Sequence, residues 1–385
     1  MSRAPRRILV CPQEFKGSLS AVEAASAIAR GLRGAWPGAE VIEAPMADGG
    51  PGTAAIILAA RGGEWVESRC SGPLGERLDA RFALVEGGRE AVIEAAATVG
   101  LVLVPEERRD PSRGWSAGVG EQIRLALDRG ASRIVIGVGG TGTNDGGAGA
   151  ARALGYRLLD AAGAELPPGP LRLATLARID ASGVDRRLAE VEVRVAVDVR
   201  NRLLGPEGAT VVYGPQKGVT AELRPLLEGA LERWADVVRR DLGVDIAGLD
   251  GGGAGGGLAA GLAAACGGRI ESGAALVASA IGLEGLVEAV DLVVTGEGRV
   301  DGQTGYGKAV AHVAGLAAER GRPCVAVVGT IDALPAGIED AEAAATGVER
   351  GVAMERAAEL VEAAAGRLAR RLEIVIDAPE GDSRG

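Results

Sequence analysis

Short apolar runs alternate with segments of helical periodicity at the start of the chain. Residues 7–11, RILVC, form an apolar run that ends at a proline and predict a buried strand. Ser20 and Glu23 stand at capping-box spacing, which predicts a helix over about 21–33. EVIEAPM then predicts a second strand and AAIILAA a second helix, on either side of a glycine loop at 48–53. This alternation is typical of βαβ units in a parallel sheet.

The middle of the chain has a different pattern. Alternating apolar and polar flanks around residues 86–89 predict a hairpin over 76–95. Residues 133–140, RIVIGVGG, predict a buried strand that enters a glycine loop, and VEVRVAV predicts another that ends before Asp198. Thr220 can cap the long amphipathic helix that we expect to run to about 240.

The strand and helix alternation returns after the run GGGAGGG. DLVVTGEG and PCVAVVG predict strands on either side of a helix near 308–319, and ERAAELVEAAAGRLARRL predicts a terminal helix. We therefore expect an α/β protein in which residues 1–75 and 285–375 form one doubly wound parallel-sheet domain. Residues 76–284 are expected to form an inserted mixed α/β domain, and 376–385 a tail.

Composition and charge exclude several classes of protein. The 385 residues are 47% hydrophobic and 24% charged, which is enough for a sizeable core and excludes a disordered chain or a coiled coil. The 42 basic and 52 acidic residues give a net charge of −10, which argues against a nucleic-acid partner. The first apolar run is too short for a signal peptide, and no run approaches the roughly 18 apolar residues of a membrane span. The four cysteines have no CxxC spacing, so we expect free thiols. We expect the protein to be cytoplasmic and to be a monomer or a homodimer.

Lysine and asparagine are rare in this chain. Three of the 42 basic residues are lysines, and there are two asparagines. Lysine is a compact point charge and arginine a planar fork, so a lysine retained among so many arginines can have a role that arginine cannot fill. The rare residues are Lys16, Lys217, Lys308, Asn144 and Asn201.

Each of these residues lies in a polar or glycine-rich loop, and most of these loops follow a predicted strand. The loops are PQEFKGS, DGGPGT, GGTGTNDGGAG, DVRNRLLGP, YGPQKG and TGEGRVDGQTGYGK. In open parallel sheets, ligands bind beyond the carboxyl ends of the strands, where loop amides and helix N-termini point outward. We therefore expect a polar, glycine-lined cleft that binds a phosphorylated ligand.

Two of the loops imitate nucleotide-binding motifs. GVGGTG at 137–142 has the GxGxxG spacing, with Asp160 near the expected ribose-binding acid, so an NAD-dependent oxidoreductase is one alternative. The residues that follow, TNDGG, lack the apolar pattern of that fingerprint's helix. GQTGYGKA at 302–309 has the GxxxxGK spacing of a P-loop, but Ala309 stands where Ser or Thr would bind Mg²⁺. His312, the single histidine, is expected to be structural.

Phosphoryl transfer fits these loops better. It needs glycine-loop amides, one or two lysines, carboxylates for Mg²⁺ and a carboxylate near the attacking hydroxyl. Each carboxylate taken singly also predicts an Asx turn or a helix cap. The carboxylates in the loops are Asp48, Asp145, Asp198, Glu297 and Asp301.

Over about residues 7–372 the chain resembles the bacterial glycerate kinase family, of the type related to the glyoxylate- and galactarate-pathway enzymes. The resemblance rests on FKGSLS, PMADGG, SGPLG, TNDGGAGA, GPQKG and TGEGRVD, in the family's order. It implies a discontinuous flavodoxin/Rossmann-like domain with an inserted mixed α/β domain and an active site between them. It also implies ATP-dependent phosphorylation of D-glycerate with Mg²⁺, with the 2-hydroxyl as the expected acceptor and 2-phosphoglycerate as the product.

The resemblance also suggests roles for individual residues, which we state as hypotheses. Lys16 contacts the acceptor carboxylate or the transferring phosphoryl group, and Asp198 is the base or a Mg²⁺ ligand. Asn144 and Asp145 orient the acceptor or phosphate, and Asp301 is a second metal ligand. The other residues expected at the substrate or ATP are Ser18, Asp48, Gly49, Gly50, Gly139, Gly140, Thr143, Asn201, Lys217, Glu297, Gly298, Arg299, Gln303, Thr304 and Lys308.

Several loop positions depart from the family's pattern. Gln13 replaces an acid and Glu14 restores the charge one residue later, while Pro51 replaces another acid and Arg202 a proline. Two alternatives therefore stay open beside D-glycerate: a kinase of a related hydroxy acid, and a weakly active or non-catalytic member of the family.

Overall fold

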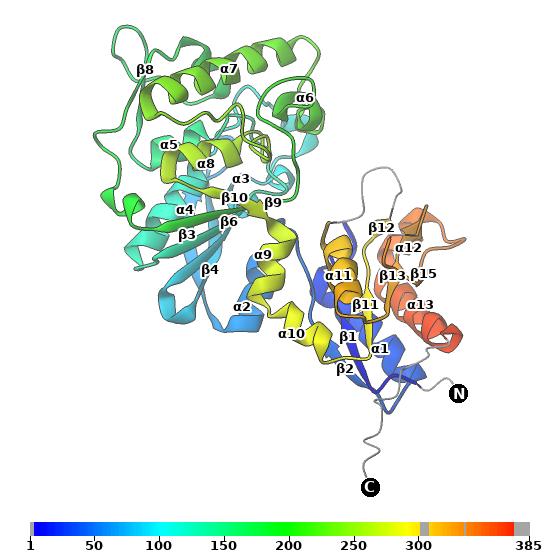
Figure 1. Cartoon of the computed structure of the whole chain (residues 1–385). Coiled ribbons are helices and arrows are strands. Elements are labelled where there is room, and N and C mark those ends of the chain that lie inside the picture. The colour runs from blue at the N-terminus through cyan, green and yellow to red at the C-terminus, as the bar shows by residue number, and fades with distance from the viewer. Residues whose placement is uncertain (1–3, 301–307, 335, 373–385) are drawn as a thin grey trace. The chain divides into compact units, whose positions relative to one another are not determined.

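The structure of the chain, a computed structural model, describes residues 4–300, 308–334 and 336–372. The chain divides into two compact units, of which unit 1 comprises Met1–Ala47 with Val277–Gly385 and unit 2 comprises Asp48–Leu276 (Figure 1). Because both ends of the chain belong to unit 1, unit 2 is an insertion within it.

Unit 1 contains a five-stranded sheet in the order β15-β13-β11-β1-β2, in which all neighbouring strands are parallel. Counted along the chain within this unit, the order is 2-1-3-4-5, which is the flavodoxin-like arrangement. The four strands expected in the two chain ends are thereby confirmed, and the fifth, β15, is one that the sequence did not predict. Their bounds are β1 (Arg7–Val10), β2 (Glu40–Glu43), β11 (Leu292–Thr295), β13 (Cys324–Val328) and β15 (Asp340–Ala343).

The helices of unit 1 follow the predicted periodicity. The capping box at Ser20 is present, because the Glu23 N–H donates to Ser20 Oγ at 3.3 Å and the Ser20 N–H donates to Glu23 Oε2 at 2.9 Å. The first and last helices pack so closely that a Cβ at Gly31 would lie 2.1 Å from the Glu362 carbonyl oxygen. The elements are α1 (Ala21–Ala35), α10 (Leu283–Glu288), α11 (Lys308–Glu319), α12 (Arg350–Glu355), α13 (Ala357–Arg371) and the short pair β12 (Arg299–Val300) and β14 (Thr330–Ile331).

Unit 2 contains a mixed six-stranded sheet in the order β10-β9-β6-β5-β4-β3. The strands β5, β6, β9 and β10 are parallel, whereas β3, β4 and β5 form an antiparallel meander. The hairpin expected over 76–95 is therefore confirmed. The bounds are β3 (Gly63–Ser71), β4 (Arg77–Val85), β5 (Glu90–Glu94), β6 (Arg133–Gly137), β9 (Glu192–Val197) and β10 (Arg269–Ser272), with a separate pair β7 (Arg157–Leu159) and β8 (Arg178–Asp180).

The helices of unit 2 enclose an apolar core that includes Phe82, Ile136 and Trp234. The expected long helix is present, and the Leu223 N–H donates to Thr220 Oγ1 at 3.3 Å before its first turn. The α-helices are α2 (Thr53–Arg61), α3 (Ala96–Val99), α4 (Ala117–Asp128), α5 (Ala148–Ala153), α6 (Ala209–Tyr213), α7 (Leu223–Leu242), α8 (Leu258–Cys266) and α9 (Gly273–Ala280).

The boundaries of the units differ from the joins expected near residues 75 and 285. The first boundary falls at 47/48, because α2 packs against β4 and β5 and because β3 pairs with β4 along its whole length. The strand at 63–71, in which exposed and buried positions alternate, was not predicted from the sequence. The second boundary falls within α9, at 276/277. Local pattern does not say which sheet a helix or strand joins, since the pairing partner lies elsewhere in the chain.

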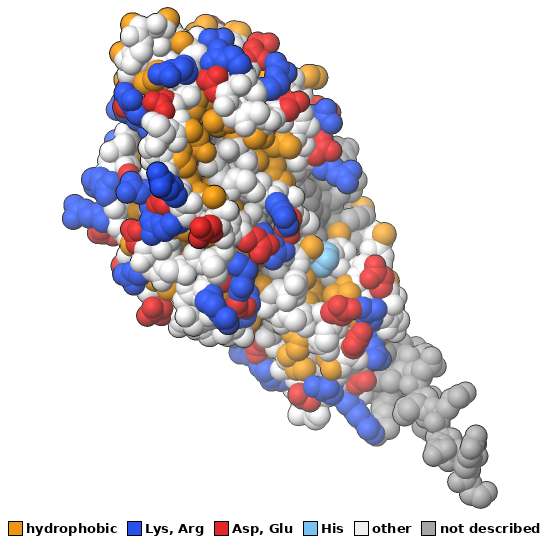
Figure 2. All heavy atoms as spheres, turned by 60° about the vertical axis from the view of Figure 1, so that its left-hand side comes forward, with side chains coloured by type: hydrophobic (Ala, Val, Ile, Leu, Met, Phe, Trp, Pro, Cys, Tyr) orange, Lys and Arg blue, Asp and Glu red, His pale blue; other side chains and the backbone are white. Residues whose placement is uncertain are grey.

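Acidic and basic side chains are interspersed on the face of the molecule that Figure 2 shows. Exposed ion pairs in the described part of the chain include Arg187 with Asp128 and Arg239 with Asp236. None of the helices in the described part of the chain is both long enough and apolar enough to span a membrane.

Candidate functional site

In unit 1 the candidate residues lie at the switch point of the sheet, where β1 and β11 are neighbours and the strand order reverses. Ligands of doubly wound sheets bind at this point, beyond the carboxyl ends of the strands. The loops that follow β1 and β11 are in contact: the Gln13 N–H donates to the Gly296 carbonyl at 2.8 Å, and a Cβ at Gly298 would lie 3.2 Å from the Lys16 nitrogen. Lys16 and Gly298 are therefore brought together by the fold.

The loop after β1 presents Lys16 on a tight turn. Gly17 has a φ of +81°, and the Phe15 carbonyl accepts hydrogen bonds from the N–H groups of Ser18 at 2.8 Å and Leu19 at 3.0 Å. Ser18 Oγ donates to the same carbonyl at 3.0 Å. Phe15 is buried while Lys16 is exposed, so the ring anchors the turn and the ammonium faces solvent.

The loop after β11 is tied to the loop after β13. The Gly329 N–H donates to the Glu297 carbonyl at 3.0 Å, and the Thr330 N–H donates to the Gly298 carbonyl at 3.1 Å. Arg299 pairs with Asp332 at 3.0 Å in an exposed position. Three expected residues, Asp301, Gln303 and Thr304, lie outside the described residues, as does most of the GxxxxGK segment; Lys308 opens α11.

In unit 2 the DGG loop lies on the carboxyl ends of β6 and β9. A Cβ at Gly137 would lie 2.2 Å from the Gly49 carbonyl oxygen, and a Cβ at Gly49 would lie 2.8 Å from the Ala196 Cβ. The Gly139 N–H donates to the same Gly49 carbonyl at 3.3 Å. Only glycine permits this approach, and the N–H of Gly50 closes the turn by donating to Asp48 Oδ1 at 3.2 Å. The expected residues Asp48, Gly49, Gly50, Gly139 and Gly140 thus belong to one surface of unit 2.

Asp145 is fully buried and has the contacts of a cap. Its carboxylate accepts hydrogen bonds from the Ser116 N–H at 2.9 Å, the Ser116 hydroxyl at 2.7 Å, the Gly149 N–H at 3.0 Å and the Gly147 N–H at 3.2 Å. Burial raises the pKa of Asp145, and these hydrogen bonds oppose the rise. The carboxylate therefore joins the starts of α4 and α5, and its contacts favour the helix-cap interpretation over direct contact with a substrate.

Lys217 is buried beside the loop after β6. Its Nζ donates to the Thr143 carbonyl at 2.7 Å, and the residue is 2% exposed. Burial lowers the pKa of Lys217 to about 8, although the negative charge of Asp145 opposes that shift. Thr143 Oγ1 and Asn144 Oδ1 are buried and lack a hydrogen-bond partner within the described part of the chain, while Asn144 Nδ2 donates to Thr210 Oγ1 at 3.0 Å. A desolvated cation and two unsatisfied oxygens thus stand together in unit 2.

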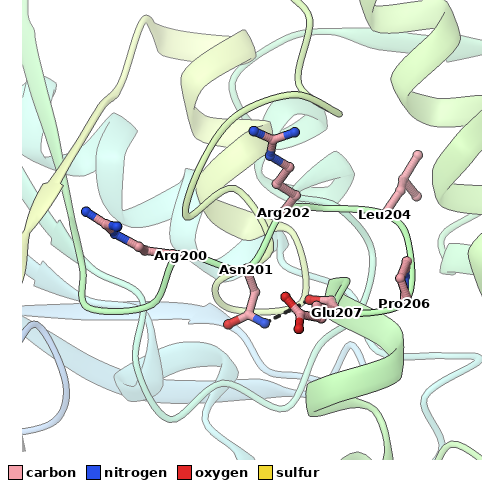
Figure 3. A pocket seen from close by; sticks show the side chains of 6 residues that line it. All are labelled: Arg200, Asn201, Arg202, Leu204, Pro206 and Glu207. Atoms are coloured by element: carbon pink, nitrogen blue, oxygen red, sulfur yellow. Dashed lines mark hydrogen bonds between the residues drawn. The ribbon is translucent and has the colours of Figure 1, made fainter. Parts of the chain in front are cut away.

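Asp198 and Asn201 follow β9 but have different surroundings. Asp198 is half-buried at the strand end, and its Oδ1 accepts a hydrogen bond from Ser272 Oγ at 3.1 Å. Both ends of the Asn201 amide are engaged: Nδ2 donates to the Glu207 carbonyl of the same loop at 2.8 Å, and Oδ1 accepts from the hydroxyl of Tyr213, at the end of α6, at 2.7 Å. Asn201 therefore shapes a loop that encloses a cavity of about 500 Å³, drawn in Figure 3.

The run GGGAGGG, residues 251–257, contributes to the site, although from the sequence it was expected only to separate two elements. The Gly146 N–H donates to the Gly256 carbonyl at 3.0 Å, and the Gly253 N–H donates to the Asn201 carbonyl at 2.9 Å. A Cβ at Gly256 would lie 2.0 Å from the Thr143 carbonyl oxygen, which is the acceptor of Lys217. The feature of the sequence that could have revealed this role is the density of glycines, because so many glycines in one loop indicate close backbone packing.

Glu94, at the end of β5, holds the start of a helix in place. Its Oε1 accepts a hydrogen bond from the Ala54 N–H at 2.7 Å, in the first turn of α2. This bond stabilises the helix that follows the DGG loop, because a carboxylate satisfies an N–H that has no partner within the helix and complements the helix dipole.

The geometry does not favour a dinucleotide site at GVGGTG. The loop after β6 continues to Gly147 before α5 begins, and α5 has only six residues. Asp160 Oδ1 accepts hydrogen bonds from the N–H groups of Ala162 and Ala164, each at 2.9 Å, so this carboxylate closes its own turn. A dinucleotide fingerprint instead needs a helix that begins within the glycine motif.

Comparisons with known proteins agree on one family. A family model described as the Glycerate kinase family matches residues 8–373. The chain is 44% identical over 325 residues to a glycerate kinase of Bacillus subtilis (strain 168) and 43% identical over 325 residues to a glycerate 2-kinase of Escherichia coli (strain K12), and each match covers 84% of this chain and 85% of the relative. A crystal structure described provisionally as glycerate kinase 2 of Salmonella typhimurium LT2 superimposes with a TM-score of 0.84 at 43% identity, covering 94% of this chain and 97% of the other.

Proposed function

The chain belongs to the glycerate kinase family, and we propose that it transfers the γ-phosphoryl group of ATP to the 2-hydroxyl of D-glycerate. The hydroxyl oxygen forms a bond to the γ-phosphorus, and the bond from that phosphorus to the bridging oxygen breaks. ADP leaves with the electron pair of the broken bond, and the hydroxyl proton passes to a base. The products are 2-phosphoglycerate and ADP.

The observation that carries the proposal is the buried polar cluster of Lys217, Thr143 and Asn144. Phosphoryl transfer depends on fixed positive charge and oriented hydrogen-bonding groups in a site from which water is excluded. Lys217 is a buried cation whose pKa of about 8 keeps it mostly protonated at neutral pH. An unpartnered buried oxygen costs about 1–3 kcal/mol, so a hydroxyl that donates to Asn144 Oδ1 or Thr143 Oγ1 would recover free energy that the free protein lacks.

The remaining roles follow from exposure and contacts. Asp198, half-buried at the end of β9, is suited to accept the hydroxyl proton or to bind the metal ion. Lys16, exposed on its glycine turn, is suited to the acceptor carboxylate or to the transferring phosphoryl group, because it forms no ion pair with any residue that the structure describes and can reach a ligand freely. Asp145 acts as a positioning residue through Ser116, Gly147 and Gly149. Glu297, Gly298 and Arg299 provide a ligand-binding wall in unit 1.

Magnesium fits the carboxylates of unit 2. Mg²⁺ is usually held by one or two protein carboxylates together with waters and phosphate oxygens. Asp198, whose Oδ1 accepts a hydrogen bond from Ser272, is such a carboxylate, and a half-buried acid at a strand end suits an ion that arrives with ATP. The bound ion would neutralise negative charge on the phosphate oxygens. Asp301, the other expected ligand, lies outside the described residues.

The test is release of ADP by the purified full chain in the presence of ATP, Mg²⁺ and a panel of hydroxy acids that includes D-glycerate, L-glycerate, tartronate and glycolate. We expect turnover with D-glycerate and a product whose phosphorus couples to the C2 proton in ³¹P NMR. Coupling to the C3 protons would instead show phosphorylation of the other hydroxyl. Turnover with another acid but not with D-glycerate would overturn the acceptor assignment, and no turnover with any acid would overturn the kinase activity.

A matched pair of substitutions tests the base. Asp198→Asn should lower turnover at least about 100-fold, since general base catalysis typically contributes two to four orders of magnitude. Asp236→Asn, in an exposed pair with Arg239 on α7, serves as the control and should leave turnover unchanged. Equal turnover of the two variants would remove Asp198 from the chemistry.

A further inference from the structure

The loop between β9 and α6 encloses a cavity that the contacts above leave without a function. Its volume is about 500 Å³, and its lining combines charged and polar side chains with the apolar side chains of Leu204 and Pro206. Figure 3 shows Arg200 and Arg202 on either side of Asn201, with Leu204, Pro206 and Glu207 completing the loop. The cavity lies beyond the carboxyl end of a parallel strand, which is where open α/β sheets bind their ligands.

The loop has a defined shape before any ligand arrives. The amide of Asn201 bonds to the Glu207 carbonyl and to the Tyr213 hydroxyl, so both ends of the side chain are engaged. The backbone carbonyls of Arg200 and Asn201 accept from the N–H groups of Gly251 at 3.2 Å and Gly253 at 2.9 Å. Asn201 is therefore a positioning residue, and the groups left for a ligand are the side chains of its neighbours.

Arg200 and Arg202 differ in the contacts of their side chains. Arg202 Nε pairs with Asp250 Oδ1 at 2.9 Å, with both side chains more than half exposed. Such an exposed pair contributes little, so a more highly charged anion can replace Asp250. Arg200 is exposed and forms no ion pair or side-chain hydrogen bond with any residue that the structure describes. The loop therefore offers one free guanidinium group and one that is easily released.

The chemistry of this lining points to a nucleotide. Guanidinium groups bind phosphate oxygens through two parallel hydrogen bonds, which suits a polyphosphate. Leu204 and Pro206 can contact an apolar ring, and the Glu207 carboxylate can accept hydrogen bonds from ribose hydroxyls. The volume is in the range of pockets that bind whole small ligands, and a three-carbon acid would fill little of it.

We propose that the cavity at Arg200–Glu207 is the nucleoside triphosphate site of unit 2, with Arg200 and Arg202 on the phosphate oxygens. This inference rests on the proposed function, because it takes ATP to be the phosphoryl donor, and it names the loop that holds it. Neither arginine was expected at the site from the sequence; Asn201 was, and its own contacts show how it orients the loop.

The experiment is calorimetric titration of the full chain with ATP, ADP, AMP, inorganic tripolyphosphate and D-glycerate. Arg200→Ala should raise the dissociation constant of ATP about 10- to 100-fold, as expected for loss of a charge-assisted hydrogen bond. Arg202→Ala should raise it less, about threefold to tenfold, because this arginine first has to leave Asp250. Tripolyphosphate should compete with ATP in the unmodified chain. Arg224→Ala, an exposed arginine of α7 outside the cavity, is the control and should change nothing.

Failure of this inference can be told apart from failure of the proposed function. If Arg200→Ala binds ATP within twofold of the unmodified chain, or loses D-glycerate instead of ATP, the nucleotide assignment is overturned even where the chain is an active kinase. If ATP binds through Arg200 but no ADP is released with D-glycerate, the proposed reaction fails and the nucleotide site stands. Arg200 is exposed, so its variant should keep the melting temperature of the unmodified chain; the binding comparison is then between equally folded proteins.

Discussion

Lys16 in unit 1 and Lys217 in unit 2 occupy opposite environments. Lys16 is exposed on a three-residue turn held by the Phe15 carbonyl, whereas Lys217 is buried and donates to the Thr143 carbonyl at 2.7 Å. The ammonium of Lys16 can therefore move to meet a ligand, while that of Lys217 is fixed and desolvated. Rarity in the sequence singled out both residues, but it could not distinguish a mobile surface cation from a preorganised buried one.

The turn that carries Lys16 and the loops around Lys217 repeat this contrast. In the Lys16 turn of unit 1, a Cβ at Gly17 would meet only the flexible end of the Met354 side chain, at 3.0 Å. In unit 2 the loops after β6 and β9 pack on the glycine run 251–257 with backbone separations that exclude a Cβ. We expect substitutions in the Lys16 turn to change catalysis with little effect on stability, and those in the loops around Lys217 to change both.

The largest expected effect is a loss of turnover at Lys16 without a matching loss of stability. Lys16→Ala should lower turnover about 100- to 1,000-fold, the usual loss when one group that stabilises developing charge is removed. The free energy of unfolding should change by less than about 0.5 kcal/mol, because the side chain is exposed and has no packing role. Steady-state kinetics and urea denaturation measure the two quantities. Near-normal turnover in Lys16→Arg would contradict a role for this compact point charge.

A pair of glycine substitutions compares the packing of the two loops. Gly256→Ala should lower the free energy of unfolding by about 3 kcal/mol, because its φ is +70° and the added Cβ would meet the Thr143 carbonyl oxygen at 2.0 Å. Gly17→Ala should cost about 1 kcal/mol, because its φ is +81° but its nearest neighbour is the flexible end of Met354. Urea denaturation followed by circular dichroism checks both values. Equal losses would show that the two loops are packed alike.

The third prediction uses the pH dependence of Lys217. Its pKa is about 8 in the folded chain and ordinarily 10.5, so between these values the unfolded chain binds more protons and stability rises with pH. Relative to Lys217→Met, the unmodified chain should gain about 2 kcal/mol in unfolding free energy from pH 7.5 to 9.5. Over the same range kcat/KM should fall about tenfold per pH unit above 8, since the cation is lost.

Lys217→Arg supplies the control for that profile. Arginine keeps its charge throughout this range, so the fall in kcat/KM above pH 8 should disappear even if turnover is lower. If the fall persists in Lys217→Arg, another group titrates. If stability does not rise in the unmodified chain, the side chain is hydrated and the burial argument fails.

The smallest expected effect is at the ion pair of unit 1. Asp332→Asn removes the partner of Arg299 but should lower the free energy of unfolding by less than about 1 kcal/mol, because both side chains are more than half exposed. Thermal unfolding at low and high salt measures it, and the small difference should shrink as salt is added. A loss above 2 kcal/mol would show that this loop is as tightly coupled as those of unit 2.

The sequence predicted most of the elements but not how they assemble. Capping at Ser20 and the apolar runs of β1, β11 and β13 are local features, and the structure confirms them. The strand β3 was missed because its alternation becomes meaningful only when it pairs with β4. The same limit explains the boundary expected near 75, which would have separated these two strands.

The sequence indicated the kind of loop that forms the candidate site, but not how the side chains of these loops are arranged. Glycines and rare polar residues singled out loops that are closely packed in the structure, and the binding of a phosphorylated ligand by these loops stays a prediction. A helix cap or turn was expected of Asp145, and its bonds from Gly147 and Gly149 are of that kind. The bonds from Ser116 to Asp145 and from Tyr213 to Asn201 were not predictable, because these partners lie 29 and 12 residues away. Of the two arginines that line the cavity, Arg202 stood out in the sequence only as a departure from the family's pattern, and Arg200 was hidden among the 39 arginines of the chain.

The sequence by itself determined the α/β class, the order of most elements and the family, because periodicity, capping and short motifs are written in neighbouring residues. The tertiary structure decided that β1 and β11 form the switch point beside Lys16, and that Lys217 is buried on a carbonyl 74 residues away. Burial and strand pairing depend on partners brought together by the whole fold. A lysine's pKa and reach, and so its chemical role, are therefore set by tertiary contacts and not by the residue type.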